Sequence, residues 1–185
     1  MKKFTFVTGN QRKLRDMRKA CDQFGIEVEQ KDLAMDEIQS HDPHEISRAK
    51  AERAFELNGG EPIVINDAFW AIPALKGFPG GYMKDVWQWF EPEDFVNLMH
   101  GKEDRRICCT ETVIYKDANQ THVISKDFWG EITGEIRGEP DRASMELVIF
   151  INGKSIAEYH QAGESAFKQY IWHDFAAWFA DQPET

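Results

Sequence analysis

Residues 4–13, Phe-Thr-Phe-Val-Thr-Gly-Asn-Gln-Arg-Lys, carry the pattern that decides the fold class of this chain. Residues 4–7 are typical of a short strand, and Thr8-Gly9-Asn10 interrupts it with turn-forming residues. Between residues 14 and 24, apolar side chains recur at steps of three and four, which predicts a helix with one buried face. A strand, a tight turn and a helix in this order are typical of the start of an α/β unit.

The following segments continue the alternation of strands and helices. Residues 26–28 alternate apolar and acidic side chains and predict a second strand. Asp42 is a good N-cap and Pro43 a good first helical residue, so we expect a second helix to begin there. Residues 63–65, Ile-Val-Ile, are typical of a strand covered on both faces, whereas the Gly- and Pro-rich residues 72–84 predict a loop.

The second half of the chain has the pattern of an antiparallel meander. We expect strands at 107–115, 121–128, 131–137 and 145–151, with one turn at Trp129-Gly130, and helices at 92–100 and 167–179. No repeat or low-complexity linker divides the sequence. The prediction is an α/β fold with a mixed, twisted sheet and flanking helices, in a single domain over residues 1–185.

Composition and charge argue against several classes of protein. The chain has 22 Lys and Arg against 32 Asp and Glu, and a net charge of -10 disfavours a protein that coats nucleic-acid duplexes. Its three cysteines have no metal-ligand spacing, so we expect buried, reduced thiols. No apolar stretch is long enough to cross a membrane, and the N-terminus leads into a strand rather than a signal peptide. We therefore expect a soluble, cytoplasmic protein with neither nucleic acid nor a membrane as partner.

Two groups of residues near helix starts are candidates for binding an anion or a metal. The Thr8-Gly9-Asn10 turn enters a helix, where backbone N–H groups and the helix dipole favour an anion, and Lys13 adds a positive charge on the first turn. An ordinary turn with a solvated lysine has the same pattern. Glu45 is either the acidic partner of a capping box or a metal ligand at the start of its helix.

Two further candidates follow the apolar strand at 63–65. Asp67 ends that strand, at the edge of the sheet where ligands of open α/β sheets bind, and there it can hold Mg²⁺ or accept a proton from water. A turn-initiating aspartate is the alternative. The glycines of residues 77–81 with Lys84 suit either a second anion site or a plain loop. Motifs of P-loop hydrolases, α/β-hydrolases and dinucleotide-binding folds are not present in the sequence.

In this order, the motifs resemble the inosine/xanthosine triphosphate pyrophosphatase family. The resemblance rests on residues 6–13 (Phe-Val-Thr-Gly-Asn-Gln-Arg-Lys), 37–39 (Glu-Ile-Gln), 43–47 (Pro-His-Glu-Ile-Ser) with Lys50-Ala51, 64–67 (Val-Ile-Asn-Asp), 74–84 (Ala-Leu-Lys-Gly-Phe-Pro-Gly-Gly-Tyr-Met-Lys), and Gly130-Glu131-Ile132 with Arg137-Gly138. It covers roughly residues 4–138, and the ordered set is more specific than any single motif.

The resemblance implies two lobes around a central nucleotide cleft, usually in a homodimer. It also implies Mg²⁺-dependent hydrolysis of a nucleoside triphosphate, possibly an aberrant one, to a monophosphate and pyrophosphate. By matching position, Glu45 would bind the metal, and Asp67 would bind it and activate water. The resemblance assigns the phosphates to a set of substrate-binding residues: Thr8, Gly9, Asn10, Lys13 and Lys84, supported by Lys50.

The chain also differs from the family pattern. Asn66 stands where the family has a first acid before Asp67, and the family's base-recognition elements do not match at residues 144–150 and 168–170. These differences leave open the preferred base and an alternative function, a nucleotide-binding sensor with the same cleft but little turnover. A third alternative is that the chain acts mainly by forming oligomers, through Trp87, Trp89 and Phe90.

Overall fold

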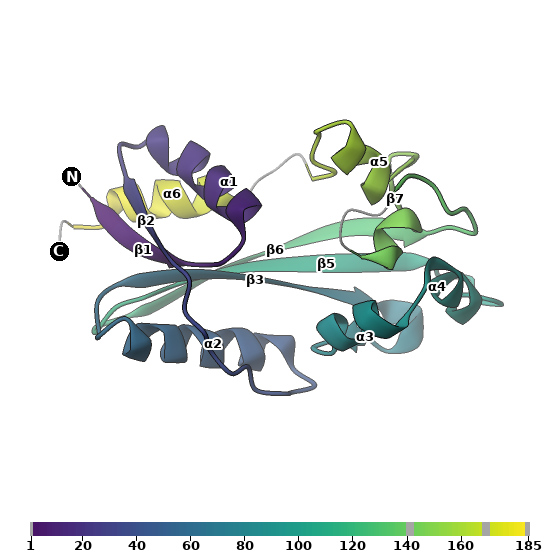
Figure 1. The fold of residues 1–185 in the computed structure, drawn as a ribbon, viewed down its shortest axis with the longest axis horizontal. Helices are drawn as coiled ribbons and strands as arrows, with labels where there is room; N and C mark the ends of the chain where they lie inside the picture. Colours follow the sequence, from purple (N-terminus) through teal and green to yellow (C-terminus); the bar gives the residue numbers. More distant parts are fainter. Residues whose placement is uncertain (1, 140–142, 168–170, 184–185) are drawn as a thin grey trace. The chain divides into compact units, whose positions relative to one another are not determined.

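The computed structural model describes residues 2–139, 143–167 and 171–183 (Figure 1). In chain order its strands and helices are β1 (Lys3–Val7), α1 (Gln11–Asp22), β2 (Glu27–Lys31), α2 (Pro43–Leu57), β3 (Ile63–Ile72), β4 (Phe78–Gly80), α3 (Met83–Trp89), α4 (Pro92–Leu98), β5 (Arg106–Lys116), β6 (Thr121–Ile132), β7 (Ile149–Ile151), β8 (Lys154–Ser155), α5 (Ile156–Gln161) and α6 (Ile171–Asp181).

The strands form one mixed sheet, as the sequence predicts. Its order is β2-β1-β3-β5-β6-β7-β8, with β4 paired to β3. β1 pairs in parallel with both β2 and β3, whereas β4, β7 and β8 pair with their neighbours in antiparallel. The chain forms two compact units, one of residues 1–68, 111–126 and 170–185 and one of residues 69–110 and 127–169.

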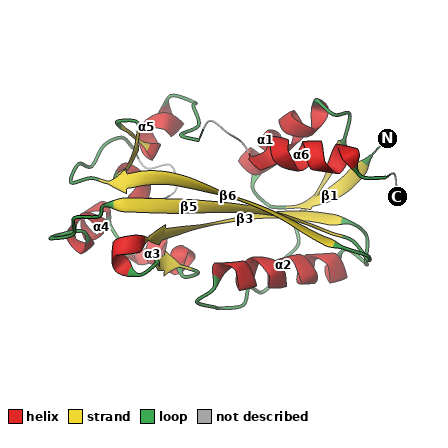
Figure 2. Ribbon diagram, turned by 180° about the vertical axis from the view of Figure 1, so that it is seen from behind, coloured by secondary structure: helices red, strands yellow, loops and turns green. Residues whose placement is uncertain are grey.

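The first unit is a three-layer sandwich. In both ribbon views α1 and α6 lie side by side on one face of its sheet and α2 covers the other (Figures 1 and 2). Phe6 on β1 is fully buried among α1 and α6, and its ring meets that of Trp172 edge-on at 5.8 Å. Val7 and Ile65 face the opposite way and pack against Ala54 of α2. Alternate side chains along each strand therefore pack into two separate hydrophobic cores, one on each face of the sheet.

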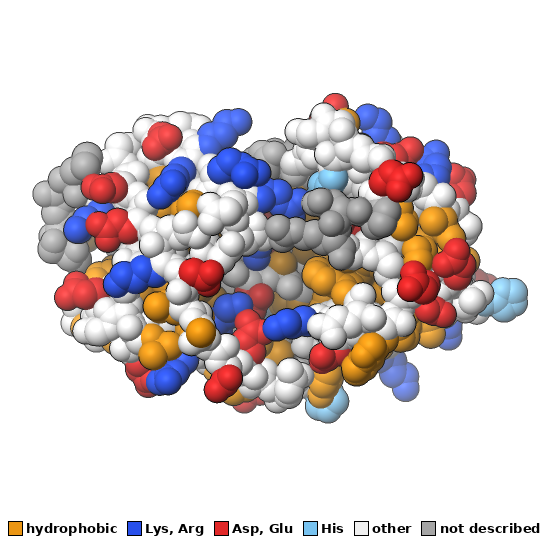
Figure 3. All heavy atoms as spheres, in the orientation of Figure 1, with side chains coloured by type: hydrophobic (Ala, Val, Ile, Leu, Met, Phe, Trp, Pro, Cys, Tyr) orange, Lys and Arg blue, Asp and Glu red, His pale blue; other side chains and the backbone are white. Residues whose placement is uncertain are grey.

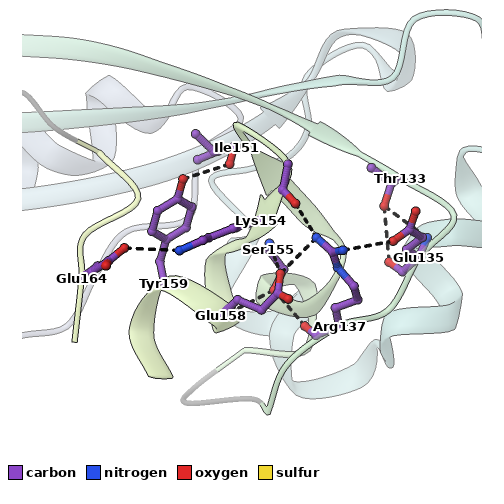
Figure 4. A network of polar contacts seen from close by, with 10 residues as sticks. Thr133, Glu135, Arg137, Ile151, Lys154, Ser155, Glu158, Tyr159 and Glu164 are labelled. Carbon is purple, nitrogen blue, oxygen red and sulfur yellow. Dashed lines mark hydrogen bonds and ion pairs between the residues drawn. The ribbon is translucent and has the colours of Figure 1, made fainter. Parts of the chain in front are cut away.

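In the second unit, a polar network joins the end of β6 to α5 (Figure 4). The guanidinium of Arg137 forms ion pairs with Glu135 at 3.6 Å and with Glu158 at 3.2 Å. Ser155 begins α5 as the N-cap of a capping box with Glu158. The hydroxyl of Tyr159, one residue further along α5, donates to the Ile151 carbonyl at 3.1 Å. These contacts tie the short β7–β8 hairpin to the helix that follows it.

The structure corrects several sequence expectations, and the first concerns the turn at Trp129-Gly130. β6 runs unbroken through both residues, and Gly130 allows a close approach of β7, since a Cβ there would lie 3.0 Å from the Phe150 carbonyl oxygen. Residues 133–137 consequently form no strand. Residues 144–147 form a 3-10 turn before β7, and the expected loop at 72–84 contains β4 and the start of α3.

The surface charge, the absence of a long apolar helix and the buried cysteines of the described residues agree with what the composition predicts. Figure 3 shows acidic and basic side chains interspersed over the face that it draws. Among the residues that the structure describes, no helix combines the length and the apolar character needed to cross a membrane. All three cysteines are buried and none forms a disulfide bond, and burial raises the pKa of the Cys21 thiol to about 12.

We predict that Phe6→Ala lowers the free energy of unfolding by about 3–5 kcal/mol, because it leaves a cavity between β1, α1 and α6. Phe24→Ala is the matched control: this ring is 36% exposed, against 0% for Phe6, and its loss should cost less than about 1 kcal/mol. Urea unfolding followed by circular dichroism measures both. Equal losses would contradict the placement of the core.

Candidate functional site

A cavity of about 280 Å³ opens in the first unit, where β1, β2 and the parallel part of β3 end. The polar side chains that line it are Thr8, Asn10, Lys13, Asp32, Glu37, Lys50, Asn66 and Asp67, and Gly9 contributes backbone. Because Phe6 pairs with Val64 and Val7 with Lys31, β1 and β2 end beside the point where the parallel pairing of β3 ends. Their carboxyl ends form the kind of sheet edge at which α/β proteins bind ligands.

The turn between β1 and α1 is held by its own side chains. The Thr8 hydroxyl accepts from the Asn10 amide at 3.1 Å, and Asn10 Oδ1 accepts from the amides of Arg12 and Lys13 at 3.0 and 3.3 Å. A Cβ at Gly9 would lie 2.9 Å from the Asp32 carboxylate, so a larger residue would push against this acid. With these amides engaged, attraction for an anion comes from Lys13 and the helix dipole.

Two lysines reach the cavity from opposite sides of the sheet. Lys13 Nζ, from α1, lies 3.5 Å from the carbonyl oxygen of Asn66. Lys50 Nζ, from α2, is bonded to Glu37 at 2.7 Å. Burial lowers the pKa of Lys50, but the negative charge of Asp67 and the bond to Glu37 outweigh it, so the pKa lies above its usual value. Lys50 is therefore a permanent cation in the cavity.

Asp67 is half-buried and held in place by two hydrogen bonds. Its Oδ2 accepts from the hydroxyl of Ser47 at 3.1 Å, and its Oδ1 accepts from the Ala68 amide at 3.1 Å. Ser47 is positioned by α2, which begins at the N-cap Asp42 as predicted. Each carboxylate oxygen of Asp67 keeps a lone pair for a metal ion or for water.

Asn66, the neighbour of Asp67 on β3, is buried with an unsatisfied oxygen. Its Nδ2 donates to the Thr112 carbonyl at 3.2 Å. Its Oδ1 has no hydrogen-bond partner among the described residues. A buried carbonyl oxygen without a partner is costly, so this position suits a bound ligand that offers a proton or a positive charge.

The oxygen atoms of the cavity suit a magnesium ion whose remaining ligands are water and phosphate oxygens. Glu37, Asp67 and Asp32 supply carboxylates and Asn66 an amide oxygen, the hard oxygen ligands that Mg²⁺ takes. In the described part of the chain, no three acidic, histidine or cysteine side chains are close enough to hold a metal by themselves. Mg²⁺ commonly uses one or two carboxylates and completes its shell with water and substrate phosphates.

The predicted site residues are thus largely, but not entirely, brought together. Thr8, Gly9, Asn10, Lys13, Lys50 and Asp67 all line the cavity. Glu45 does not: it is exposed on the first turn of α2, where its carboxylate accepts from Ser40 at 2.6 Å. Lys84 is exposed on α3 of the second unit, so its role stays a prediction. Glu37 is the acid that sequence reasoning missed, although it stands in the quoted Glu-Ile-Gln element.

Of the two segments that differ from the family's base-recognition elements, the structure describes only residues 144–150. Residues 144–147 form the 3-10 turn and residues 149–151 form β7. Residues 168–170 lie outside the described residues.

Comparisons with known proteins identify the family and agree with the fold. The family model described as Ham1 family matches residues 4–165. The "dITP/XTP pyrophosphatase" of Methanopyrus kandleri is 35% identical over 138 residues, 75% of this chain and 71% of that protein. The "Inosine triphosphate pyrophosphatase" of Tuber melanosporum is 30% identical over 175 residues, 93% of this chain and 90% of that protein. A HAM1 protein structure from Coxiella burnetii has the same fold, with a TM-score of 0.80, 16% identity and coverage of 98% of this chain and all of that one. The chain belongs to the Ham1 family.

Proposed function

We propose that this protein is a Mg²⁺-dependent nucleoside triphosphate pyrophosphatase that removes aberrant nucleotides from the cellular pool. The observation that carries the proposal is the placement of Asp67 in one cavity with Lys13, Lys50 and Glu37. Relatives in the same family are named dITP/XTP pyrophosphatase and inosine triphosphate pyrophosphatase. The products would be a nucleoside monophosphate and pyrophosphate.

The residues of the cavity divide the work of such a reaction. Lys13 and Lys50 bind and orient the triphosphate, and Thr8, Gly9 and Asn10 shape the wall against which it lies. Asp67 takes a proton from a water molecule as the water oxygen bonds to the α-phosphorus and the bond to the bridging oxygen breaks. Glu37 and Asp67 would hold Mg²⁺, with the orphaned oxygen of Asn66 beside them. When bound, Mg²⁺ neutralises charge on the phosphate oxygens.

We also propose that the protein acts as a homodimer in the cytoplasm, where its nucleotide substrates are dissolved. Light scattering coupled to gel filtration measures the mass, for which one chain contributes 21.4 kDa. A mass near that value at working concentration would contradict the dimer.

A second candidate, a nucleotide sensor, is favoured by one observation. Asn66 carries no charge where the resembling family has an acid, so the cavity holds less negative charge for a metal. A panel of purine, pyrimidine and modified triphosphates, assayed for pyrophosphate with Mg²⁺ and with chelator, separates the two functions. We expect pyrophosphate release that the chelator abolishes, whereas Mg²⁺-dependent nucleotide binding without release would identify a sensor.

We predict that Asp67→Asn lowers kcat/KM for the best substrate by about 10²-fold or more, because the amide cannot accept the water proton. The matched control is Asp42→Asn, which keeps a good N-cap on α2 and should leave both stability and activity nearly unchanged. Steady-state pyrophosphate release measures both variants. Full activity of Asp67→Asn would remove this residue from the mechanism.

Separate substitution of Glu37 and Glu45 by glutamine tests which of the two carboxylates binds the metal ion. We predict that Glu37→Gln raises the Mg²⁺ concentration needed for half-maximal activity by at least about tenfold, because one charge is lost from the site of a divalent cation. Glu45→Gln should leave that concentration unchanged, since its carboxylate lies on the exposed turn at Ser40. A shift for Glu45→Gln alone would restore the sequence prediction.

A further inference from the structure

Glu111, on β5, is a carboxylate in the first unit that the proposed reaction does not use. Val113 and Tyr115, at the next alternate positions of β5, pack into the core beneath α1 and α6. Alternation along the strand therefore directs Glu111 to the same face. Asn66 lies on that face as well, because Val64, two residues before it, belongs to the same core. Glu111 thus lies behind the wall of the cavity, beneath the first turns of α1.

The charged groups around Glu111 come mainly from α1. Burial raises the pKa of Glu111, the positive charges of Lys13 and Arg12 oppose this rise, and the negative charge of Asp16 adds to it. On β6, Lys126 is the cross-strand neighbour on this face, because the hydroxyls of Thr112 and Ser125 meet at 2.9 Å on the other face. The ammonium of Lys126 is bonded to Asp174 of α6 at 2.9 Å.

Lys13 therefore interacts with the charge of Glu111, and it also lines the cavity in which the phosphates of the proposed reaction would lie. A carboxylate behind a lysine lowers the positive potential that the lysine projects into the cavity. In a partly buried setting this effect is larger than in water, because solvent screens it less.

We propose that Glu111 is a positioning residue that weakens the hold of Lys13 on phosphate groups and thereby speeds the release of pyrophosphate. Lys13 must attract a triphosphate yet let a pyrophosphate leave, and a fixed negative charge behind it limits how tightly either is held. The inference rests on the proposed function, which makes pyrophosphate a product. It adds a residue whose charge controls product affinity without touching the reacting atoms.

The test is the affinity of the full-length protein for inorganic pyrophosphate with Mg²⁺ at pH 8, measured by isothermal titration calorimetry. Glu111→Gln keeps the shape and removes the charge, and we expect about three- to tenfold tighter binding. Its inhibition constant for pyrophosphate in the enzymatic assay should fall by the same factor. Glu111→Met also removes the charge and should tighten binding as well. Because methionine has no amide, this variant shows that the effect does not come from new hydrogen bonds of the glutamine side chain.

Two further variants show whether the effect passes through Lys13. In a Lys13→Met background, Glu111→Gln should no longer change pyrophosphate affinity. Glu27→Gln removes one charge from the same unit at the opposite end of the parallel strands, where Glu27 pairs with Lys3, and should leave affinity unchanged.

The outcomes separate the inference from the function on which it rests. Unchanged or weaker pyrophosphate binding in both folded Glu111 variants, with normal binding by the unmodified protein, would overturn only the role of Glu111. The same tightening in Glu27→Gln would also overturn it, since it would then reflect net charge alone. No pyrophosphate binding by the unmodified protein would overturn both the inference and the proposed function.

Discussion

Parallel pairing of β1 with β2 and β3 is the constraint on which the site depends. β1 and β2 end next to the point where β3 leaves its pairing with β1, so that Thr8, Asp32 and Asn66 meet although they are far apart in sequence. The helices that follow and precede these strands then bring in the cations, Lys13 from α1 and Lys50 from α2. A one-residue register shift between β1 and β3 would turn Asn66 and Asp67 each to the other face of the sheet and would move Asp67 away from Ser47 of α2.

Negative and positive side chains nearly balance in the cavity. Three carboxylates and two ammonium groups line it, and each lysine is already engaged, Lys50 by Glu37 and Asp67, and Lys13 by the Asn66 carbonyl. We propose that the carboxylates attract a divalent cation and that the lysines attract a phosphate chain. Glu111 extends this balance one layer deeper, because it acts on Lys13 from within the fold.

The sequence predicted those parts of the fold and site in which chemistry is local. Lys13 lies on the first turn of α1, as predicted, and Asp67 follows the apolar residues of β3, although β3 continues past it to Ile72 and only its pairing with β1 ends before Asp67. Glu37 could not be found this way, because residues 32–42 between β2 and α2 form neither helix nor strand and have no period to read. The turn predicted at Gly130 is wrong for a different reason. The small size of this residue allows a close contact with Phe150, which lies twenty residues away in sequence. The position of Glu111 beneath α1 could not be predicted from the sequence, because it depends on which strands β5 pairs with.

We propose that this cavity directs cleavage between the α- and β-phosphates. The most direct test is ³¹P NMR of the products formed from inosine or xanthosine triphosphate, or from whichever triphosphate the enzyme turns over fastest. We expect nucleoside monophosphate and pyrophosphate in equal amounts, with no nucleoside diphosphate at any time. Nucleoside diphosphate with orthophosphate as the initial products would contradict it.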